Sequence, residues 1–202
     1  SGWRTWRKVF YDLHISTQPI HILEIGCYQG EATTWFLRNL CHHPESKVYA
    51  VDTFAGSPEY ITTNFPKVEQ TFWRNLRETG RESQVEVHKS LSYDVLVKMN
   101  TARKHPFLDV VFIDASHESH DVIADGLLSF ALLKIGGIMV FDDYEWDKLV
   151  QSYYRPKLAI DAFLSIMQPQ IQILVKRSQV ILRKTSRSDS PLAQETSRAT
   201  II

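Results

Sequence analysis

Three aspartates stand where apolar segments of the sequence end. Asp114 follows the apolar run at 108–113, and Asp142 and Asp143 follow the run at 138–141. Neighbouring parallel strands lie about 4.8 Å apart and end at the same edge of a sheet, so we expect the three carboxylates to converge. Like charges repel unless a cation neutralises them, and oxygen-only ligands suit Mg²⁺ or another hard divalent ion. The competing interpretation is that Asp114 binds a backbone amide while the other two shape a loop.

A histidine stands close to the first of these aspartates. His117 follows Asp114 by three residues, which places it over the same edge of the expected sheet. A neutral imidazole there can remove a proton from a bound hydroxyl group. The alternatives are a metal ligand or a hydrogen bond at the start of a helix. His120, one helical turn further on, is a candidate to assist.

A glycine-containing turn, Glu24-Ile-Gly26-Cys-Tyr28-Gln-Gly30, follows another apolar segment. Glycines let the backbone turn sharply and approach a ligand closely, although a plain strand-to-helix turn also uses them. Tyr28 fills the middle position, so the turn is not the dinucleotide fingerprint G-x-G-x-x-G. Asp52 ends the next apolar segment, where a carboxylate can accept two hydrogen bonds from a ribose diol, or simply face solvent.

The elements that must position these residues follow from the periodicity of the apolar side chains. The sequence predicts an amphipathic helix within 1–20 and strands at 21–25, 47–51, 84–88, 108–113, 138–141, 170–175 and 179–183. Helices are predicted at 31–41, 67–79, 92–103, 119–134 and 157–167. Alternating strands and helices indicate an α/β fold with a doubly wound, mostly parallel sheet. The short connection at 176–178 suits only an antiparallel hairpin.

With these elements in place, residues 20–184 resemble class I S-adenosylmethionine-dependent methyltransferases. The turn from Glu24 to Gly30 resembles their motif I, although Tyr28 departs from the commonest glycine pattern, and Asp52 matches their ribose-binding acid. The segments at 51–58 and 141–144 resemble the macrocin O-methyltransferase-like and related small-molecule families. The resemblance implies a seven-stranded sheet of order 3-2-1-4-5-7-6 with the last strand antiparallel.

The resemblance also implies roles for individual residues. The cofactor-binding residues would be Glu24, Gly26, Tyr28, Gly30, Asp52, Thr53, Phe54, Ser90 and Asp114. The catalytic residues would be His117 and Asp114, and the metal ligands would be Asp114, Asp142 and Asp143. Phe54 would stack near the adenine or anchor its loop, and Ser90 would contact the adenine or cap a helix. The implied reaction moves a methyl group from S-adenosylmethionine to a small-molecule acceptor, such as a hydroxyl of a sugar, phenol or natural-product-like molecule, with possible help from Mg²⁺.

Three rival functions are weighed on the same residues. Tyr28 and the terminal hairpin disfavour an NAD-dependent dehydrogenase. Many nucleic-acid or protein N-methyltransferases that act on amino groups carry an Asn/Asp-Pro-Pro-aromatic motif after the fourth strand, where this chain has 114–117 without proline. A degenerate, non-catalytic binding module is disfavoured by the intact acidic set.

Composition and length frame these expectations. The 202 residues carry 23 Lys and Arg and 23 Asp and Glu, a balance that argues against general nucleic-acid binding. No apolar run is long enough to span a membrane, and no signal peptide is recognisable. Two cysteines expected to be reduced, Cys27 and Cys41, suggest the cytoplasm. We expect a helical segment at 1–20 over the site, a methyltransferase domain at 21–184 and a disordered tail at 185–202. The start at Ser1 suggests a domain of a larger protein, and a homodimer is left open.

Overall fold

The computed structural model describes residues 2–56, 65–102, 105–146 and 155–186. The strands are β1 (His21–Ile25), β2 (Lys47–Val51), β3 (Val85–His88), β4 (Leu108–Ile113), β5 (Leu133–Phe141), β6 (Ile171–Lys176) and β7 (Val180–Lys184). The helices are α1 (Gly2–Val9), α2 (Tyr11–His14), α3 (Glu31–Asn39), α4 (Phe65–Arg77), α5 (Ser92–Ala102), α6 (Ser119–Leu132) and α7 (Pro156–Met167). Short 3₁₀ turns lie at Glu82–Gln84 and Gln168–Gln170.

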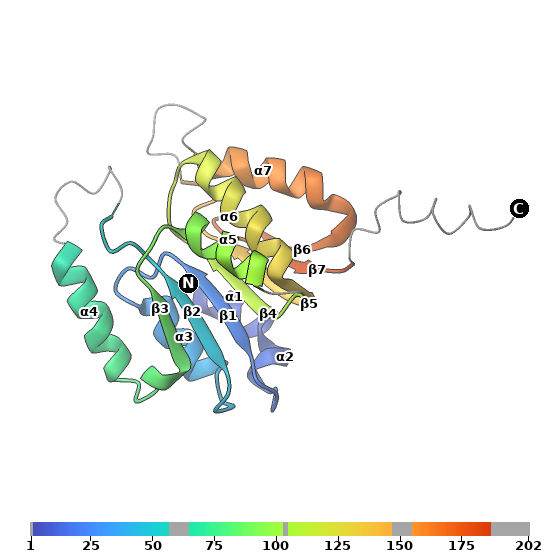
Figure 1. Cartoon of the computed structure of the whole chain (residues 1–202). Coiled ribbons are helices and arrows are strands. Elements are labelled where there is room, and N and C mark those ends of the chain that lie inside the picture. Colours follow the sequence, from blue (N-terminus) through green and yellow to red (C-terminus); the bar gives the residue numbers. More distant parts are fainter. Residues whose placement is uncertain (1, 57–64, 103–104, 147–154, 187–202) are drawn as a thin grey trace, which may run out of the picture.

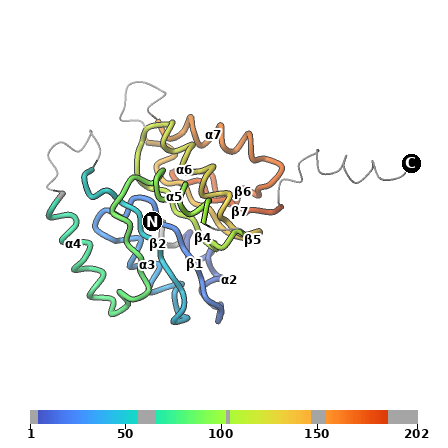
Figure 2. The backbone as a smooth tube through the Cα atoms, viewed as in Figure 1, coloured from blue at the N-terminus to red at the C-terminus, as the bar shows by residue number. Residues whose placement is uncertain are grey.

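The seven strands form one sheet of order β3-β2-β1-β4-β5-β7-β6, which confirms the predicted fold and order. Strands β1 to β5 are parallel, and β7 is antiparallel to both of its neighbours, β5 and β6. Figure 2 shows the chain moving from β1 outward to β3, back across to β4 and β5, and finally to the hairpin at the other edge. The order in which the chain adds strands to the sheet reverses between β1 and β4, and ligands of doubly wound sheets bind outside such a switch point.

Each face of the sheet is covered by its own set of helices. Helices α5, α6 and α7 lie together on one face (Figure 1), where side chains such as Leu96, Phe130 and Phe163 join the core. On the other face, α1, α3 and α4 contribute an aromatic-rich core that includes Trp6, Phe10, Phe36 and Phe72. Because both faces are covered, a central strand such as β4 is a nearly continuous apolar run.

The structure differs most from the sequence prediction at the first helix and at the start of β5. The helix expected within 1–20 is divided at Phe10 into α1 and α2. Strand β5 begins at Leu133 and passes through the glycine pair that was expected to precede it, with Gly136 at φ +83°. The β4–β5 register shifts between Leu108 and Val110, where the extra chain is absorbed. The tail prediction concerns mainly residues 187–202, which lie outside the described residues.

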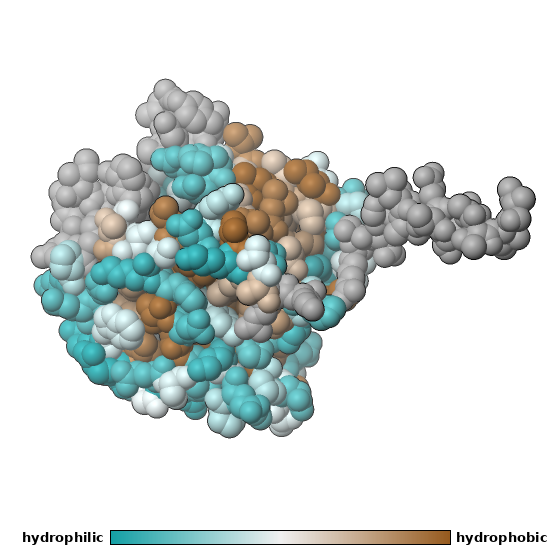
Figure 3. Space-filling view, in the orientation of Figure 1, coloured by the Kyte–Doolittle hydropathy of each residue, from teal (hydrophilic) through white to brown (hydrophobic). Residues whose placement is uncertain are grey.

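The described surface is mixed in character. Hydrophobic surface gathers over α7 (Figure 3), where Leu158 and Ile166 are exposed. Among the described residues, no helix combines the length and hydropathy needed to cross a membrane. Both cysteines are buried and unbridged, as expected.

Candidate active site

The glycine turn joins the carboxyl ends of β1 and β4. Gly26 has φ +86°, and a Cβ atom added to it would lie 1.9 Å from the backbone oxygen of Asp114. The Asp114 amide in turn donates to the oxygen of Ile25 at 2.9 Å. Glycine is therefore required at position 26 because two strand ends touch there, before any ligand is considered.

Gly30 serves the packing of the neighbouring helices. It precedes α3 at φ +82°, and a Cβ atom would lie 3.0 Å from the ring of Phe72 on α4. Gly30 is buried and does not line the pocket described below. Its position explains the glycine through the turn and the contact with Phe72.

Asp52 holds the glycine turn from the end of β2. Its Oδ2 accepts the backbone N–H groups of Cys27 at 2.8 Å and Tyr28 at 2.9 Å, and its Oδ1 accepts that of Phe54 at 2.7 Å. The sequence pattern predicted that this carboxylate binds a ribose or faces solvent, and it did not indicate the hydrogen bonds to the turn. Each carboxylate oxygen has two acceptor sites, so capacity remains for a ligand.

The other residues predicted at this end lie beside the turn. Phe54 is buried at φ +52° and packs on Phe72 with ring centroids 5.3 Å apart, which matches the alternative of a loop anchor. Thr53 Oγ1 accepts the N–H of Ala55 at 3.2 Å. Ser90 lies between β3 and α5, with its N–H donating to the oxygen of His88 at 3.0 Å. None of the three predicted residues lines the described pocket.

A pocket of about 310 Å³ opens between the glycine turn, α1, the ends of β4 and β5, and the residue before β7. Four acidic side chains line it, namely Glu24, Glu31, Asp114 and Asp142. Trp6, Tyr28 and Phe112 add aromatic surface, and Gln179 stands at the β7 side. The sequence predicted Glu24, Gly26, Tyr28, Asp114 and Asp142 at the site, and this pocket brings them together. Gln179 and Glu31 were missed, because no local motif marks either residue.

Glu24 is a buried carboxyl group with an unused oxygen. Its Oε2 accepts the hydroxyl of Thr33 at 2.6 Å, whereas Oε1 has no hydrogen-bond partner among the described residues. Burial disfavours the charged form and raises the pKa of Glu24 to about 8, and Asp114 and Asp52 add to this effect while Thr33 opposes it. A buried acceptor without a donor is costly, which suits a ligand that brings a donor or a positive charge.

Asp114 and Asp142 also line this pocket, and their charges interact. The side chain of Asp114 reaches the pocket solvent, yet the surrounding walls hinder its hydration, and this desolvation with the charges of Asp142 and Asp143 raises its pKa to about 7. Burial also raises the pKa of Asp142, but two donors oppose the shift. They are the N–H of Asp143 at 2.8 Å and the side-chain amide of Gln179 at 2.9 Å.

Asp143 turns toward His117. Asp143 has φ +55°, and its Oδ2 lies 3.0 Å from Nε2 of His117. His117 is 5% exposed, and its ring stacks on Trp146 with centroids 4.0 Å apart and planes at 9°. The histidine therefore lies in a small neighbouring cavity with Asp143, and the carboxylate fixes the orientation of its ring.

The predicted metal ligands are neighbours with different partners. In the described part of the chain, the acidic and histidine groups whose ligand atoms all lie within 4.8 Å of one another are Glu118, His120 and Asp121. Asp114, Asp142 and Asp143 do not form such a group, because Asp142 is held by Gln179 and Asp143 by His117. His120 is exposed, 3.4 Å from a carboxylate oxygen of each of its two acidic neighbours.

The comparisons with known proteins agree with this architecture. The model of a family described as a methyltransferase domain matches residues 23–144, more than half of the chain. No curated protein sequence matches the chain significantly.

Solved structures share the fold at low identity. The O-methyltransferase TomG of Streptomyces achromogenes, which is involved in tomaymycin synthesis and was solved with SAM, has a TM-score of 0.65 and 16% identity, over 91% of this chain and 80% of that one. An O-methyltransferase of Bacillus cereus in complex with SAH has a TM-score of 0.66 and 19% identity, over 91% and 81%. A putative rRNA methylase of Clostridium thermocellum has a TM-score of 0.65 and 13% identity, over 91% and 97%. By family and by fold, the chain belongs to the class I S-adenosylmethionine-dependent methyltransferases.

Proposed function

We propose that the protein transfers a methyl group from S-adenosylmethionine to an oxygen of a small-molecule acceptor. The observation that carries the proposal is the unpartnered Oε1 of Glu24 in a pocket lined by three further carboxyl groups. S-adenosylmethionine carries an ammonium and a sulfonium group, and both charges suit such walls. Bound there, it would supply an electrophilic methyl group on its sulfonium.

The residues of the pocket divide between holding and proton transfer. Glu24 and the turn at Gly26 and Tyr28 would hold the amino-acid part of the cofactor, and Asp52 would bind its ribose. Asp114, which faces the pocket, would take the proton that leaves the acceptor hydroxyl as its oxygen–methyl bond forms. His117, oriented by Asp143, would then accept that proton from Asp114.

A divalent cation is the second element of the proposal. Asp114, Asp142 and Asp143 stand on adjacent strand ends, and the charges of Asp142 and Asp143 help to raise the pKa of Asp114. A cation relieves repulsion in such a setting. A cation held there would bind the acceptor oxygen and make its hydroxyl more acidic. Excess EDTA would then abolish turnover and leave cofactor binding intact; full turnover in EDTA would refute the cation and leave the methyltransferase proposal standing.

The proposed cofactor site is tested by calorimetry and thermal shift with S-adenosylhomocysteine and with NAD. We expect binding and stabilisation by the first ligand alone. Glu24→Gln should weaken binding, because it removes the buried carboxylate that would pair with the ammonium group of the cofactor. The matched variant Glu31→Gln alters an exposed carboxylate on the rim of the same pocket and should change affinity less. Stabilisation by neither ligand would favour a non-catalytic binding module.

The acceptor class needs its own measurement. Mass spectrometry of sugars, phenols and primary amines after incubation with S-adenosylmethionine and Mg²⁺ should show methylation on oxygen. Methylation of the amines alone would favour an N-methyltransferase.

The two buried thiols fit the proposed location in the reducing cytoplasm.

A further inference from the structure

One glutamine links the two ends of the described chain to the pocket. The indole Nε1–H of Trp6 on α1 donates to Oε1 of Gln179 at 2.9 Å. The amide Nε2 of Gln179 donates to Oδ2 of Asp142, also at 2.9 Å. All three side chains line the same pocket. A residue from the first helix is therefore connected to a carboxylate at the end of β5 through a single amide.

The chemistry of the partners fixes the orientation of this amide. An indole N–H donates hydrogen bonds and cannot accept them, whereas an ionised carboxylate accepts hydrogen bonds and cannot donate them. The amide must therefore present its oxygen to Trp6 and its nitrogen to Asp142. A side chain that only donates or only accepts cannot satisfy both neighbours at once.

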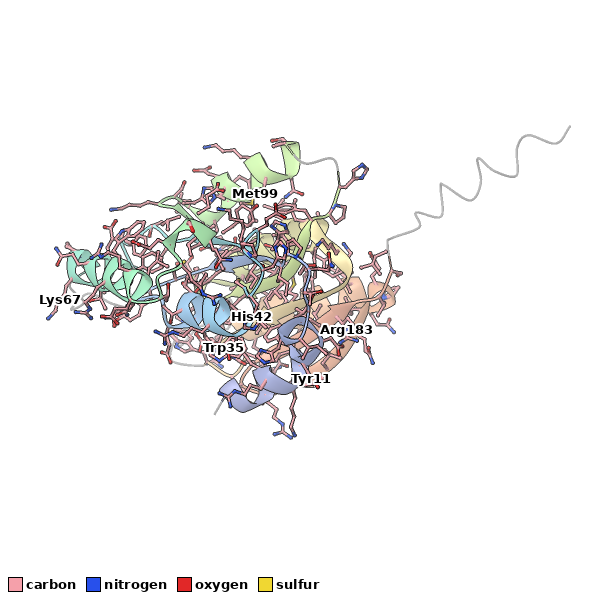
Figure 4. The ribbon with its side chains drawn as sticks, turned by 90° about the horizontal axis from the view of Figure 1, so that it is seen from below. Tyr11, Trp35, His42, Lys67, Met99 and Arg183 are labelled. Atoms are coloured by element: carbon pink, nitrogen blue, oxygen red, sulfur yellow. The ribbon has the colours of Figure 1, made fainter. Side chains whose placement is uncertain are left out.

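The Trp6 end of the link is held firmly. Trp6 is 2% exposed, stacks on Phe36 with planes at 10° and meets Phe112 edge-on, with centroids 5.0 Å apart. In the view from below, α1 lies against α3, the helix that carries the labelled Trp35 (Figure 4), whose ring is 5.1 Å from Trp6. The indole N–H is consequently a donor in a fixed place.

The sheet brings Gln179 to Asp142. Strands β5 and β7 are antiparallel, and their register pairs Phe141 with Val180. The residue after Phe141 therefore lies opposite the residue before Val180. This register is the reason why the glutamine meets the carboxylate at the carboxyl end of β5.

We propose that Gln179 is a positioning residue, which holds Asp142 in the wall of the cofactor pocket, and that Trp6 keeps Gln179 in the orientation this requires. The inference rests on the proposed function, because it assigns Asp142 to the pocket that takes S-adenosylmethionine. Asp142 lines the pocket together with the like charge of Asp114, so the amide donor opposes its displacement from the wall.

The hydrogen bond itself is tested by nuclear magnetic resonance of the indole N–H groups. The Trp6 signal, identified by its loss in Trp6→Phe, should exchange slowly with solvent and should exchange faster in Gln179→Leu. Gln179→Glu keeps an acceptor for the indole, so the signal should stay protected. Rapid exchange of the Trp6 signal in the wild-type protein would overturn the proposal.

The positioning role is tested by calorimetry of S-adenosylmethionine binding. Gln179→Glu replaces the donor to Asp142 with a repelling carboxylate, and we expect roughly tenfold weaker binding. Gln172→Glu makes the same change at an exposed site on β6 and should leave the affinity unchanged. In an Asp142→Ala background, Gln179→Glu should have little further effect, because the group that it positions is absent.

The outcomes separate the two proposals. A wild-type protein that does not bind S-adenosylmethionine refutes the proposed function, and this inference with it. Normal wild-type binding with unchanged affinity in Gln179→Glu refutes the positioning role alone. An equal loss of affinity with and without Asp142 shows that Gln179 acts by another route and also refutes the role. Trp6→Phe should weaken binding less than Gln179→Glu, since it frees the amide without adding charge.

Discussion

The two halves of the sheet's carboxyl edge hold their carboxylates in different ways. At the β1–β2 half, Asp52 accepts hydrogen bonds from three backbone N–H groups. Two belong to the glycine turn, and the third belongs to the loop that follows Asp52 itself. At the β4–β5 half, Asp142 and Asp143 depend on side chains from remote segments, Gln179 and His117. The first half is stabilised by the backbone, whereas the second is an assembly of side chains beside like charges. We therefore expect the loss of the backbone contacts of Gly26 and Asp52 in the first half to affect folding, and substitutions of the carboxylates in the second half to affect folding less.

The junction of the halves should be the most sensitive point. Gly26→Ala places a Cβ atom 1.9 Å from the backbone of Asp114 at a positive φ. The loss of unfolding free energy should reach about 3 kcal/mol or more, because overpacking and backbone strain add. Urea denaturation measures it. Gly80→Ala is the matched control, since Gly80 has φ +65° with no atom near its would-be Cβ and should lose only about 1–2 kcal/mol. Equal losses in the two variants would show that the contact at Gly26 is unimportant.

Asp52→Ala should also destabilise the first half, but less than Gly26→Ala. Removing the acceptor of three N–H groups should reduce the unfolding free energy of the ligand-free protein by about 1.5–3 kcal/mol. Asp52→Asn keeps one acceptor oxygen and should lose less. Thermal unfolding without cofactor checks both variants. An Asp52→Ala protein as stable as the wild type would mean that the carboxylate serves the ligand alone.

Glu24 should make cofactor affinity depend on pH. Its raised pKa, about 8, means that the ligand-free protein holds a proton on this carboxyl at neutral pH. An ammonium ligand favours the ionised form, so binding should release the proton, and affinity should rise by at most about tenfold per pH unit up to about pH 8. Calorimetry in buffers of different ionisation enthalpy measures the released proton, and a flat profile from pH 6 to 8 would contradict it.

The same group sets the sign of a stability change. A carboxyl group whose folded pKa lies above its ordinary value of 4.5 binds its proton more tightly when the chain is folded. The stability that it contributes is present at low pH and is lost as the pH rises toward about 8. Glu24→Gln should flatten this decline in the ligand-free protein.

The second half should tolerate the loss of a charge. Asp143→Asn removes one of the like charges near Asp114, and asparagine accepts the left-handed φ of +55° readily. We expect a change in unfolding free energy within about 1 kcal/mol, because the carboxylate is half-exposed and its pair with His117 contributes little. Chemical denaturation of the variant checks this. A loss as large as that of Asp52→Ala would remove the distinction between the two halves.

Sequence patterns predicted the sheet because its information is local. Apolar runs and glycine turns marked the strands of β1 to β5, and the short link at 176–178 correctly indicated the hairpin. The pocket residues near Gly26 were readable for the same reason, since a turn and its strand are contiguous. Gln179 was not readable, because its role arises from the β5–β7 register and from a helix 173 residues away in sequence.

Sequence spacing also could not predict where side chains point. Three aspartates on adjacent strand ends suggested a single cluster, but Asp143 has a left-handed φ and its carboxylate pairs with His117. His117 lies at the expected edge of the sheet beside the aspartates, but its ring is buried against Trp146, which the sequence did not indicate. The dihedral angles of single residues decide these contacts, and the spacing of apolar residues in the sequence does not reveal those angles.

The link between Trp6 and Gln179 has a consequence for biosynthesis. A ribosome adds about 5–20 residues per second, so the first helix emerges many seconds before the hairpin that completes its contacts. During that time the large apolar side chain of Trp6 can pack on Phe36 and Phe112, but its indole donor has no amide to meet. The wall of the pocket is thus finished only with the last strands, and a nascent chain released before Gln179 would carry the glycine turn without a complete site.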